Sequence, residues 1–519
     1  MSVGEQLRRN SLRYPDKPVI IDHGVEVSYR EFNERVNRLA HGLLRSGAVR
    51  GDRIALYLDN CHEALEVLAA CLKLGLVHVP LNSRLLASEV LELVTDAGAK
   101  IVIADPAHAE QLDQMCAQFA ETARYLMIRD GAPGYDSYEQ LLADGDPGEP
   151  DVRVTDDDGA YILYTSGTTG HAKGVYSTQR QVVAHALSVV IPEYQLHADA
   201  RILILYPHNS AASVNNAVVP ALMLGATLVL DDVRGFTAPR FLRNVERLRI
   251  THLTVVPTML TRVLRHIEEH GLTQDISSLE VIAYGSAPMA PALTRRWLDI
   301  VGRKLIQVYG MTEATAVISI LRKSEHDPDT ELGSRRLASC GCPVALLEVQ
   351  IVDDDGRPLP DGEIGEIRFR SPFVMSGYWN DRERTAQTIR DGWLHTGDVG
   401  RRDRDGFLYV VDRKKDLIIS GGQNIASKEV EDALYLHPGV AEAAVIGIPD
   451  DEWGEVVHAV VVVEGVTESE LTDFLAGRLA SFKRPRSMEF RAELPKNAIG
   501  KIQKGELRAP FWADRQRQV

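Results

Sequence analysis

The feature that most restricts the fold of this sequence is a repeated alternation of short apolar runs with amphipathic segments. The runs are rich in Val, Ile and Leu, and they cover residues 54–58, 77–80, 101–104, 202–205, 227–230, 253–256, 281–284 and 305–309. Fully apolar strands that alternate with helices are typical of parallel sheets with helices on both faces. We therefore expect an α/β fold in which doubly wound, mostly parallel sheets form a large N-terminal region.

The pattern changes after about residue 344. Strand-like runs near residues 349–356 and 365–370 are separated by Asp and Gly turns, which predicts a β-rich subdomain. A charged segment at 412–416 then precedes a final stretch with helices and strands of its own. We place the main boundary there, with an N-terminal domain over 1–414 and a small α+β C-terminal domain over 415–519.

Composition excludes several classes of protein. With 45% hydrophobic and 25% charged residues the chain is an ordinary globular sequence, and a net charge of −15 argues against nucleic-acid binding. Five scattered cysteines suit a reducing compartment, and the pair Cys340 and Cys342 is interpreted as buried small residues, not as half of a metal site. Because neither a signal peptide nor a long apolar run is evident, we expect a cytoplasmic protein without a membrane span. The sequence leaves a homodimer and a monomer equally open.

A loop rich in Gly, Ser and Thr follows the apolar run at 161–164. It contains Thr165, Ser166, Gly167, Thr168, Thr169 and Gly170, with Lys173 three residues further on. Glycines let the backbone approach an anion closely, while hydroxyls and the lysine add donors and positive charge. The glycine spacing differs from that of the common P-loop. The segment therefore predicts a different kind of phosphate-binding loop, although a lone segment of this composition could also be a mobile surface turn.

A set of segments, in order along the chain, resembles the motifs of the adenylate-forming (AMP-binding) superfamily, and among its branches the acyl- and aryl-CoA synthetases. The segments are 164–175, 285–288, 307–313, 393–398, 412–416 and 500–501, and they span most of the chain. The resemblance implies activation of a carboxylic acid by ATP and Mg²⁺ to an acyl-adenylate, followed by thioester formation with coenzyme A. Pro is frequent in this family at the position of Ala172, so we expect a slightly looser phosphate loop here.

The resemblance also assigns roles to residues around the nucleotide. Glu313 would hold Mg²⁺, and Thr312 would contact the α-phosphate or the substrate carboxylate. Asp398 would accept hydrogen bonds from the ribose hydroxyls, and Arg413 would add donors beside it. Adenine would stack on Tyr309 and bond to Gln307, and the rest of the nucleotide site would comprise Gly285, Ser286, Ala287, Pro288, Gly310 and Met311.

Residues of the C-terminal domain would serve both half-reactions. Lys501 resembles the family lysine that bridges the carboxylate and the α-phosphate during adenylation, whereas Lys496 and Lys504 are neighbours that the resemblance does not select. Rotation about Lys415 would withdraw Lys501 and bring Gly421 and Gly422 to a tunnel for the pantetheine arm. The CoA nucleotide would contact Trp453, Phe482, Arg484 and Arg486. The alternative for this last set is domain packing by the two aromatic rings beside a solvated basic loop.

The acyl pocket is expected around His208, which aligns with a residue that commonly gates the carboxylate site. Small, partly polar residues follow it, which suggests room for a bulky, aryl or alicyclic, or fatty monocarboxylic acid. Three alternatives stay open at this stage. They are transfer of the acyl group to the phosphopantetheine of a separate acyl carrier protein, an inactive nucleotide-binding regulator, and an oxygenase of the luciferase type.

Overall fold

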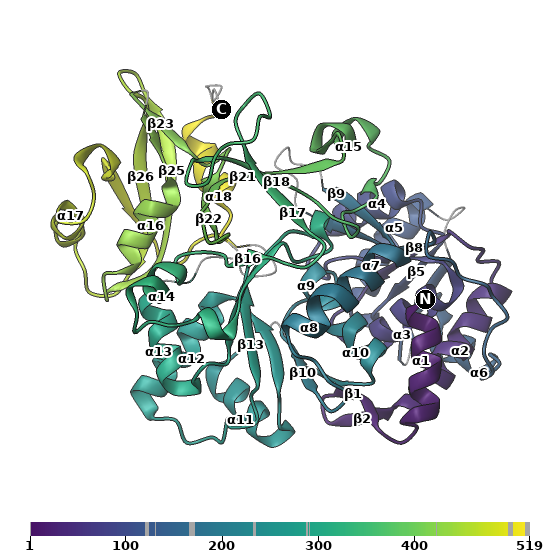
Figure 1. Ribbon diagram of the computed structural model, residues 1–519. Helices are drawn as coiled ribbons and strands as arrows, with labels where there is room; N and C mark the ends of the chain where they lie inside the picture. Colours follow the sequence, from purple (N-terminus) through teal and green to yellow (C-terminus); the bar gives the residue numbers. More distant parts are fainter. Residues whose placement is uncertain are drawn as a thin grey trace.

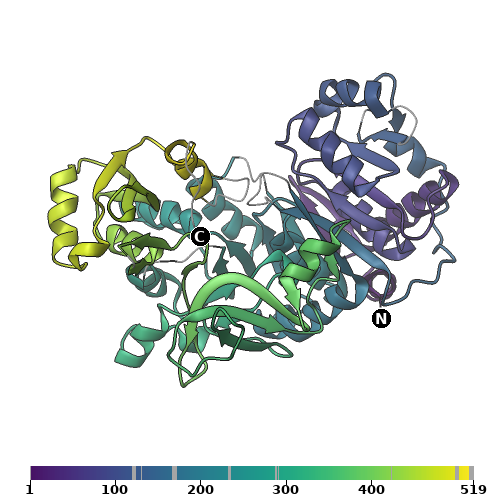
Figure 2. The same ribbon diagram turned by 90° about the horizontal axis from the view of Figure 1, so that it is seen from above.

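The computed structural model describes residues 2–119, 124–129, 131–165, 172–231, 235–286, 289, 291–421, 423–496 and 502–513. Two large sheets with helices packed between them form the body of the molecule, and a small C-terminal domain lies beside it (Figure 1). Figure 2 shows this small domain at one end of the molecule and the eight-stranded sheet at the other. The predicted α/β class, with its separate α+β C-terminal part, is confirmed.

The eight-stranded sheet lies in the N-terminal half and is mostly parallel. Its order is β19 (Gly377–Tyr378), β9 (Lys173–Thr178), β8 (Gly159–Thr165), β4 (Val77–Pro80), β3 (Arg53–Tyr57), β5 (Ile101–Ala104), β6 (Arg124–Met127) and β7 (Asp136–Ser137). Only the β8–β9 and β9–β19 pairs are antiparallel. Helices α2 (Tyr29–Arg45), α3 (His62–Leu74), α4 (Ala87–Ala97), α5 (Ala109–Phe119) and α6 (Tyr138–Ala143) belong to this half.

The nine-stranded sheet carries the other half of the body. Its order is β16 (Cys342–Pro343), β15 (Ser319–Leu321), β14 (Leu305–Tyr309), β13 (Val281–Gly285), β12 (His252–Val255), β10 (Arg201–Ile204), β11 (Thr227–Leu230), β1 (Pro18–Asp22) and β2 (Val25–Ser28). Strands β1 and β10–β14 are parallel to their neighbours in this set. Helices α11 (Ala238–Leu248), α12 (Pro257–His270) and α13 (Pro291–Val301) cover one face.

One large core joins the two sheets. It includes Phe32 of α2, Leu68 of α3 and Val190 of a π-helical turn (Ala186–Val190) after α7 (Gln179–His185), all almost fully buried. Residues of β3 and β8 pack on one side of these helices and residues of β10 and β13 on the other. Burial on both faces explains why the parallel strands are apolar throughout.

The β-rich subdomain follows, as predicted. Its sheet contains β17 (Glu348–Val352), β18 (Gly365–Arg370), β21 (Trp393–Arg402), β20 (Ile389–Arg390) and β22 (Leu408–Arg413). Its core cluster also takes in Val175 of β9 and Ala314, so it packs directly onto the two sheets of the body.

The last part of the chain has a core of its own, made of residues between Ile418 and Met488. It contains β23 (Ile418–Ser420), β24 (Gln423–Ile425), α16 (Ser427–Tyr435), β25 (Val440–Asp450), β26 (Gly454–Val463), α17 (Glu468–Ala476), β27 (Ser487–Phe490) and α18 (Lys504–Arg508). Helix α17 ends at Ala476, and Gly477 is its C-cap residue. Within the described part of the chain, no helix is long and apolar enough to cross a membrane.

Candidate active site

Predicted nucleotide residues from distant parts of the chain meet at the carboxyl end of β14. Tyr309, the last residue of β14, donates its hydroxyl hydrogen bond to Asp398 Oδ2 at 2.6 Å. Asp398 Oδ1 lies 3.2 Å from Arg413 Nε, across the β21–β22 ladder. Asp398 is nearly buried and Arg413 is half-exposed, so the carboxylate is held in place while the guanidinium still reaches solvent. Burial and the neighbouring carboxylate both raise the pKa of Tyr309, which keeps its hydroxyl a donor.

Glu313 lies on a short 3₁₀ turn, Thr312–Ala314, directly after β14. The backbone before this turn passes very close to Ala316. A Cβ on Gly310 would lie 1.6 Å from the Ala316 carbonyl oxygen, so only glycine fits at this position. The Glu313 side chain is nearly buried, and its Oε1 accepts a 2.7 Å hydrogen bond from the Tyr378 hydroxyl. A buried, oriented carboxylate is a suitable ligand for Mg²⁺, which prefers oxygen donors.

Lys173 lies beside this carboxylate. It begins β9, and its Nζ is 5.3 Å from the centre of the Tyr378 ring that binds Glu313. Burial and Arg384 lower the pKa of Lys173, and Glu313 acts in the opposite direction. Thr165 pairs with Lys173 in the antiparallel β8–β9 ladder, so these two residues of the predicted phosphate loop lie side by side. Ser166, Gly167, Thr168, Thr169 and Gly170 lie outside the described residues.

Of the four residues predicted to line the adenine, the structure describes Gly285 and Ser286. Ala287 and Pro288 lie outside the described residues. A Cβ on Gly285 would lie 2.4 Å from the Val308 carbonyl oxygen, so glycine allows β13 to pass close to β14. Ser286 follows with a φ of +66°, an uncommon backbone conformation for a residue other than glycine, and is exposed. Gln307 Oε1 accepts a 3.2 Å bond from Tyr284. Thr312 and Met311 are half-buried on the same turn.

His208 lies at the predicted mouth of the acyl pocket, held by the loop after β3. Its backbone N–H donates to Asn60 Oδ1 at 2.7 Å, and its Nε2 lies 2.8 Å from the Leu58 carbonyl oxygen. Because a carbonyl only accepts, Nε2 carries the proton and Nδ1 has a free lone pair, with no partner among the described residues. Burial lowers the pKa of His208, so the imidazole is neutral.

The sequence did not identify two of these supporting residues, Asn60 and Tyr378. Asn60 lies 148 positions from His208, and Tyr378 lies 65 positions from Glu313. Neither residue belongs to a sequence motif, and contacts between such distant positions become visible only in the folded structure.

Lys415, the predicted hinge residue, has an exposed side chain and lies within electrostatic range of Arg413 and Lys173. Partial desolvation lowers its pKa, and the positive charges of Arg413 and Lys173 act in the same direction. Gly421 has a φ of +55° and packs on the indole of Trp453, since a Cβ there would lie 2.6 Å from that ring. Gly422 and Lys501 lie outside the described residues, so the position of the catalytic lysine stays a prediction.

The predicted CoA residues divide into two groups. The Arg486 guanidinium lies 4.8 Å from the centre of the Trp453 ring, and Trp453 and Phe482 are 39% and 48% exposed, as open ligand-binding rings would be. Arg484 instead donates to the carbonyls of Leu479 and Ala476, both at 2.8 Å, at the end of α17. In this conformation it serves as a helix cap.

The two neighbouring lysines are held by carboxylates. Lys504 lies 2.7 Å from Glu431 and also donates to Ser427 Oγ at 2.7 Å, and Lys496 pairs with Glu442. Both lysines are engaged with carboxylates of the C-terminal domain.

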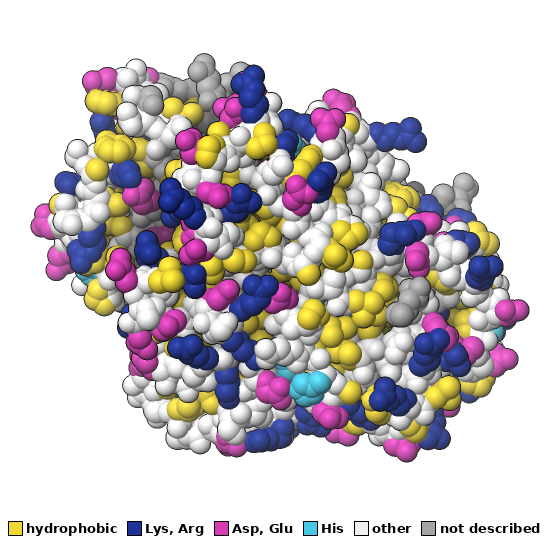
Figure 3. All heavy atoms as spheres, in the orientation of Figure 1, with side chains coloured by type: hydrophobic (Ala, Val, Ile, Leu, Met, Phe, Trp, Pro, Cys, Tyr) yellow, Lys and Arg dark blue, Asp and Glu magenta, His cyan; other side chains and the backbone are white. Residues whose placement is uncertain are grey.

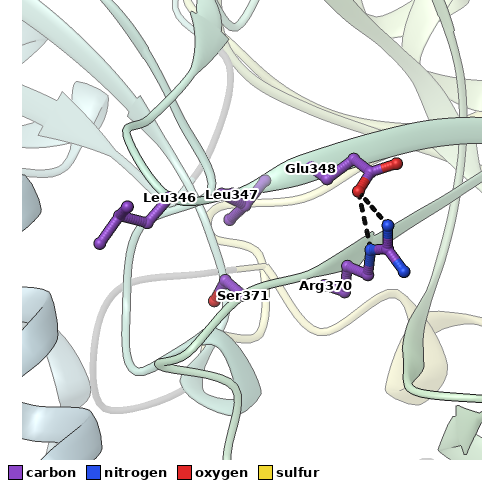
Figure 4. A pocket seen from close by; sticks show the side chains of 5 residues that line it. All are labelled: Leu346, Leu347, Glu348, Arg370 and Ser371. Carbon is purple, nitrogen blue, oxygen red and sulfur yellow. Dashed lines mark hydrogen bonds and ion pairs between the residues drawn. The ribbon is translucent and has the colours of Figure 1, made fainter.

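Other features lie outside this site. Cys340 and Cys342 are free thiols, the first buried and the second half-buried. A shallow pocket on β17 and β18 is lined by Leu346, Leu347, Glu348, Arg370 and Ser371 (Figure 4), none of which was predicted as a site residue. Acidic and basic side chains are interspersed on the face in Figure 3, without a broad basic patch.

Comparison with known proteins places this geometry in context. Residues 7–379 match the family model "AMP-binding enzyme", and residues 429–501 match "AMP-binding enzyme C-terminal domain". The chain is 39% identical to feruloyl-CoA synthase of Amycolatopsis sp over 507 residues, which is 97% of this chain and 98% of that protein. It is 36% identical to indoleacetate–CoA ligase of Aromatoleum aromaticum, covering 98% of each. The crystal structure of ATP-bound MatB from Rhodopseudomonas palustris superposes with a TM-score of 0.86 at 30% identity, covering 98% of this chain and 99% of that one.

Proposed function

Because the chain belongs to the AMP-binding enzyme family and is an acyl-CoA synthetase of its acid:CoA ligase branch, we propose that it activates an aryl or aryl-aliphatic monocarboxylic acid with ATP and Mg²⁺. The observation that carries this proposal is that two groups of contacts lie together. One links Tyr309, Asp398 and Arg413, and the other is the hydrogen bond from Tyr378 to Glu313 beside Lys173. The first group suits a ribose and a base, and the second suits a metal-bound phosphate.

In the first half-reaction, a carboxylate oxygen attacks the α-phosphorus of ATP and pyrophosphate leaves. Asp398 accepts hydrogen bonds from the ribose, and Lys173 neutralises charge on the departing phosphates. Glu313 would hold Mg²⁺, which when bound shields the phosphate charge. Lys501 bridges the carboxylate and the α-phosphate.

In the second half-reaction, the sulfur of CoA attacks the acyl carbon, AMP leaves, and the thiol proton passes to solvent. This requires Lys501 to withdraw, which we assign to rotation about Lys415. The rings of Trp453 and Phe482 are exposed and Arg486 lies over the first, which supports a role for them in stacking on the CoA nucleotide.

The segment after His208 supports an acid with a ring that bears a polar substituent. Ser213 Oγ and Asn216 Oδ1 are buried and have no hydrogen-bond partner among the described residues. A buried polar atom without a partner is costly, so a ligand that supplies one is favoured. Two of the relatives act on ring-bearing acids by name, feruloyl and indoleacetate.

The proposal is tested by measuring pyrophosphate release with a panel of ferulate, indoleacetate, benzoate and a medium-chain fatty acid. We expect the highest kcat/KM with a ring-bearing acid, and a fatty acid that outperforms all of them would overturn the substrate class. Adding either CoA or a phosphopantetheinylated carrier protein then identifies the thiol acceptor.

Lys501→Ala tests the two-step mechanism. It should reduce ATP–pyrophosphate exchange by about 100-fold or more, as removal of an electrostatic contact to the transition state does. Thioester formation from preformed adenylate should stay near wild type. Lys496→Ala, which removes a nearby lysine paired with Glu442, is the matched control. Equal loss of both half-reactions in Lys501→Ala would contradict the proposed withdrawal.

A further inference from the structure

A group of metal-ligating side chains lies where β1 ends and α3 begins, apart from the nucleotide site. Asp22 closes β1, and His62 and Glu63 open α3. Asp22 Oδ2 accepts hydrogen bonds from the His62 backbone N–H at 3.1 Å and from its Nδ1 at 2.9 Å. Glu63 Oε2 lies 3.5 Å from the same Nδ1, and one ligand atom from each of the three residues lies within 4.8 Å of the others.

The two carboxylates are buried, and each has one oxygen without a hydrogen-bond partner among the described residues. The Glu63 side chain is 3% exposed and that of Asp22 is 10% exposed. Glu63 Oε2 and Asp22 Oδ1 have no hydrogen-bond donor among the described residues. A buried carboxylate oxygen without a hydrogen bond costs free energy, so two of them on residues of one group require an explanation.

Nearby cations do not supply those donors. Arg129 Nε lies 3.7 Å from the other oxygen of Glu63, and its Nη1 binds Asp105 at 2.9 Å. His23 Nε2 lies 3.9 Å from Asp22 Oδ1, which is beyond hydrogen-bond distance. Neither oxygen therefore has a hydrogen-bond donor among the described residues, and a bound cation would supply the missing interaction.

We propose that Asp22, His62 and Glu63 bind one divalent transition-metal ion of the Zn²⁺ or Co²⁺ class. One imidazole nitrogen with two carboxylate oxygens is a ligand set that zinc uses, whereas Mg²⁺ and Ca²⁺ prefer oxygen alone. Binding would displace the Nδ1 proton of His62 to solvent, and water would complete the tetrahedral shell. The backbone N–H of His62 still holds Asp22 in place.

The position suggests what the ion does. Asn60 lies two residues before His62, and its side chain donates to the Tyr206 carbonyl at 2.9 Å and accepts from His208 N–H. An ion that ties Asp22 to the start of α3 would brace the turn that positions His208. This role is structural and is independent of the proposed reaction.

A second group, His197, His252 and Glu280, also has metal-ligating residues but lacks these features. Both ring nitrogens of His252 are engaged, with Thr251 Oγ1 at 2.7 Å and the Tyr194 carbonyl at 3.0 Å. Glu280 is 46% exposed and pairs with His197. This group serves as the control.

The test is titration of chelator-treated full-length protein with Co²⁺, followed by its visible d–d absorption, and with Zn²⁺ by calorimetry. We expect one ion per chain. His62→Gln and Asp22→Asn should each raise Kd by more than about 100-fold, since loss of an outer-shell partner alone costs 10–100-fold. His197→Gln and Glu313→Gln should bind as the wild type does, which separates this site from the control group and from the Mg²⁺ site.

Two results would overturn the proposal. One is an absence of binding by the wild type, and the other is binding that His62→Gln leaves unchanged or that only Glu313→Gln removes. His62 is partly exposed and Gln retains a donor for Asp22, so this variant should fold, which its melting temperature in chelator verifies.

Discussion

At the scale of single residues, the site depends on hydrogen bonds that orient its carboxylates. The Tyr378 hydroxyl donates to Glu313 Oε1 at 2.7 Å, and both groups are largely buried. Burial and the neighbouring carboxylate raise the pKa of Tyr378, so it stays a donor over the working pH range. A residue with this function acts on the metal through the ligand that it holds.

Tyr378→Phe should therefore weaken Mg²⁺ use without removing a ligand. We expect the Mg²⁺ concentration for half-maximal pyrophosphate exchange to rise by about 10-fold or more, as for other partners of metal ligands. The measurement is the exchange rate over a Mg²⁺ series at saturating ATP. Tyr409→Phe is the control. The Tyr409 hydroxyl donates a 3.1 Å hydrogen bond to Asp403, which is not one of the predicted site residues. A change in maximal rate alone, at constant Mg²⁺ dependence, would contradict this assignment.

At the scale of elements, a network of buried charges joins the hinge to α16 and α18. Asp412 at the end of β22 accepts from Ser427 N–H and Oγ, the latter at 2.7 Å, and Asp416 pairs with Arg508 at 2.7 Å. Asp416 and Arg508 are 12% and 13% exposed. Burial alone would raise the pKa of Asp416, but Lys504 and Arg508 outweigh it and lower the pKa below its ordinary value of 3.8.

The sign of the pH effect follows from this shift. A carboxyl whose pKa is lower in the folded state stabilises the fold above its unfolded pKa, and this contribution is lost as the pH falls through the folded pKa. Asp416→Asn should destabilise the protein by about 3–5 kcal/mol near neutral pH, because it leaves Arg508 buried and unpaired. The difference from wild type should shrink below about pH 4.

Thermal melting over a pH series checks this prediction. Asp354→Asn is the matched control, since Asp354 pairs with Lys414 at 2.8 Å but is 93% exposed, and a surface pair contributes little. A constant gap between Asp416→Asn and wild type from neutral to acid pH would refute the role of the Asp416 carboxylate.

The elements also show how far the sequence could predict the fold. Strands β4, β5 and β14 agree residue for residue with the predicted runs, because these strands of the parallel sheets are mostly apolar. Strand β9 was missed, since Lys173–Thr178 is polar at alternate positions and pairs antiparallel with β8. The resemblance to a family identified the site motifs in the sequence. It did not identify Asn60 and Tyr378, because they contribute through contacts between segments that are distant in the sequence.

At the scale of the whole molecule, the C-terminal domain has an apolar core separate from that of the body, and an exposed ion pair joins the two parts. Across this boundary, Arg265 of α12 lies 3.1 Å from Glu464, and the two side chains are 49% and 72% exposed. The core of residues 418–488 includes no residue of the body. Domains that share no apolar core can reorient at lower cost, which the proposed exchange of half-reactions requires.

Fixing this orientation should therefore separate the two half-reactions. In Arg265→Cys with Glu464→Cys, a short cleavable bis-maleimide should hold the domains as they stand, and the trapped enzyme should retain at most one of pyrophosphate exchange and thioester formation from acyl-adenylate. Cleavage of the linker should restore the other, because only the rotation was blocked. Each single-cysteine variant, treated in the same way, controls for modification of the native thiols. If the cross-linked protein carries out both steps at the rate of the cleaved protein, the C-terminal domain does not need to rotate.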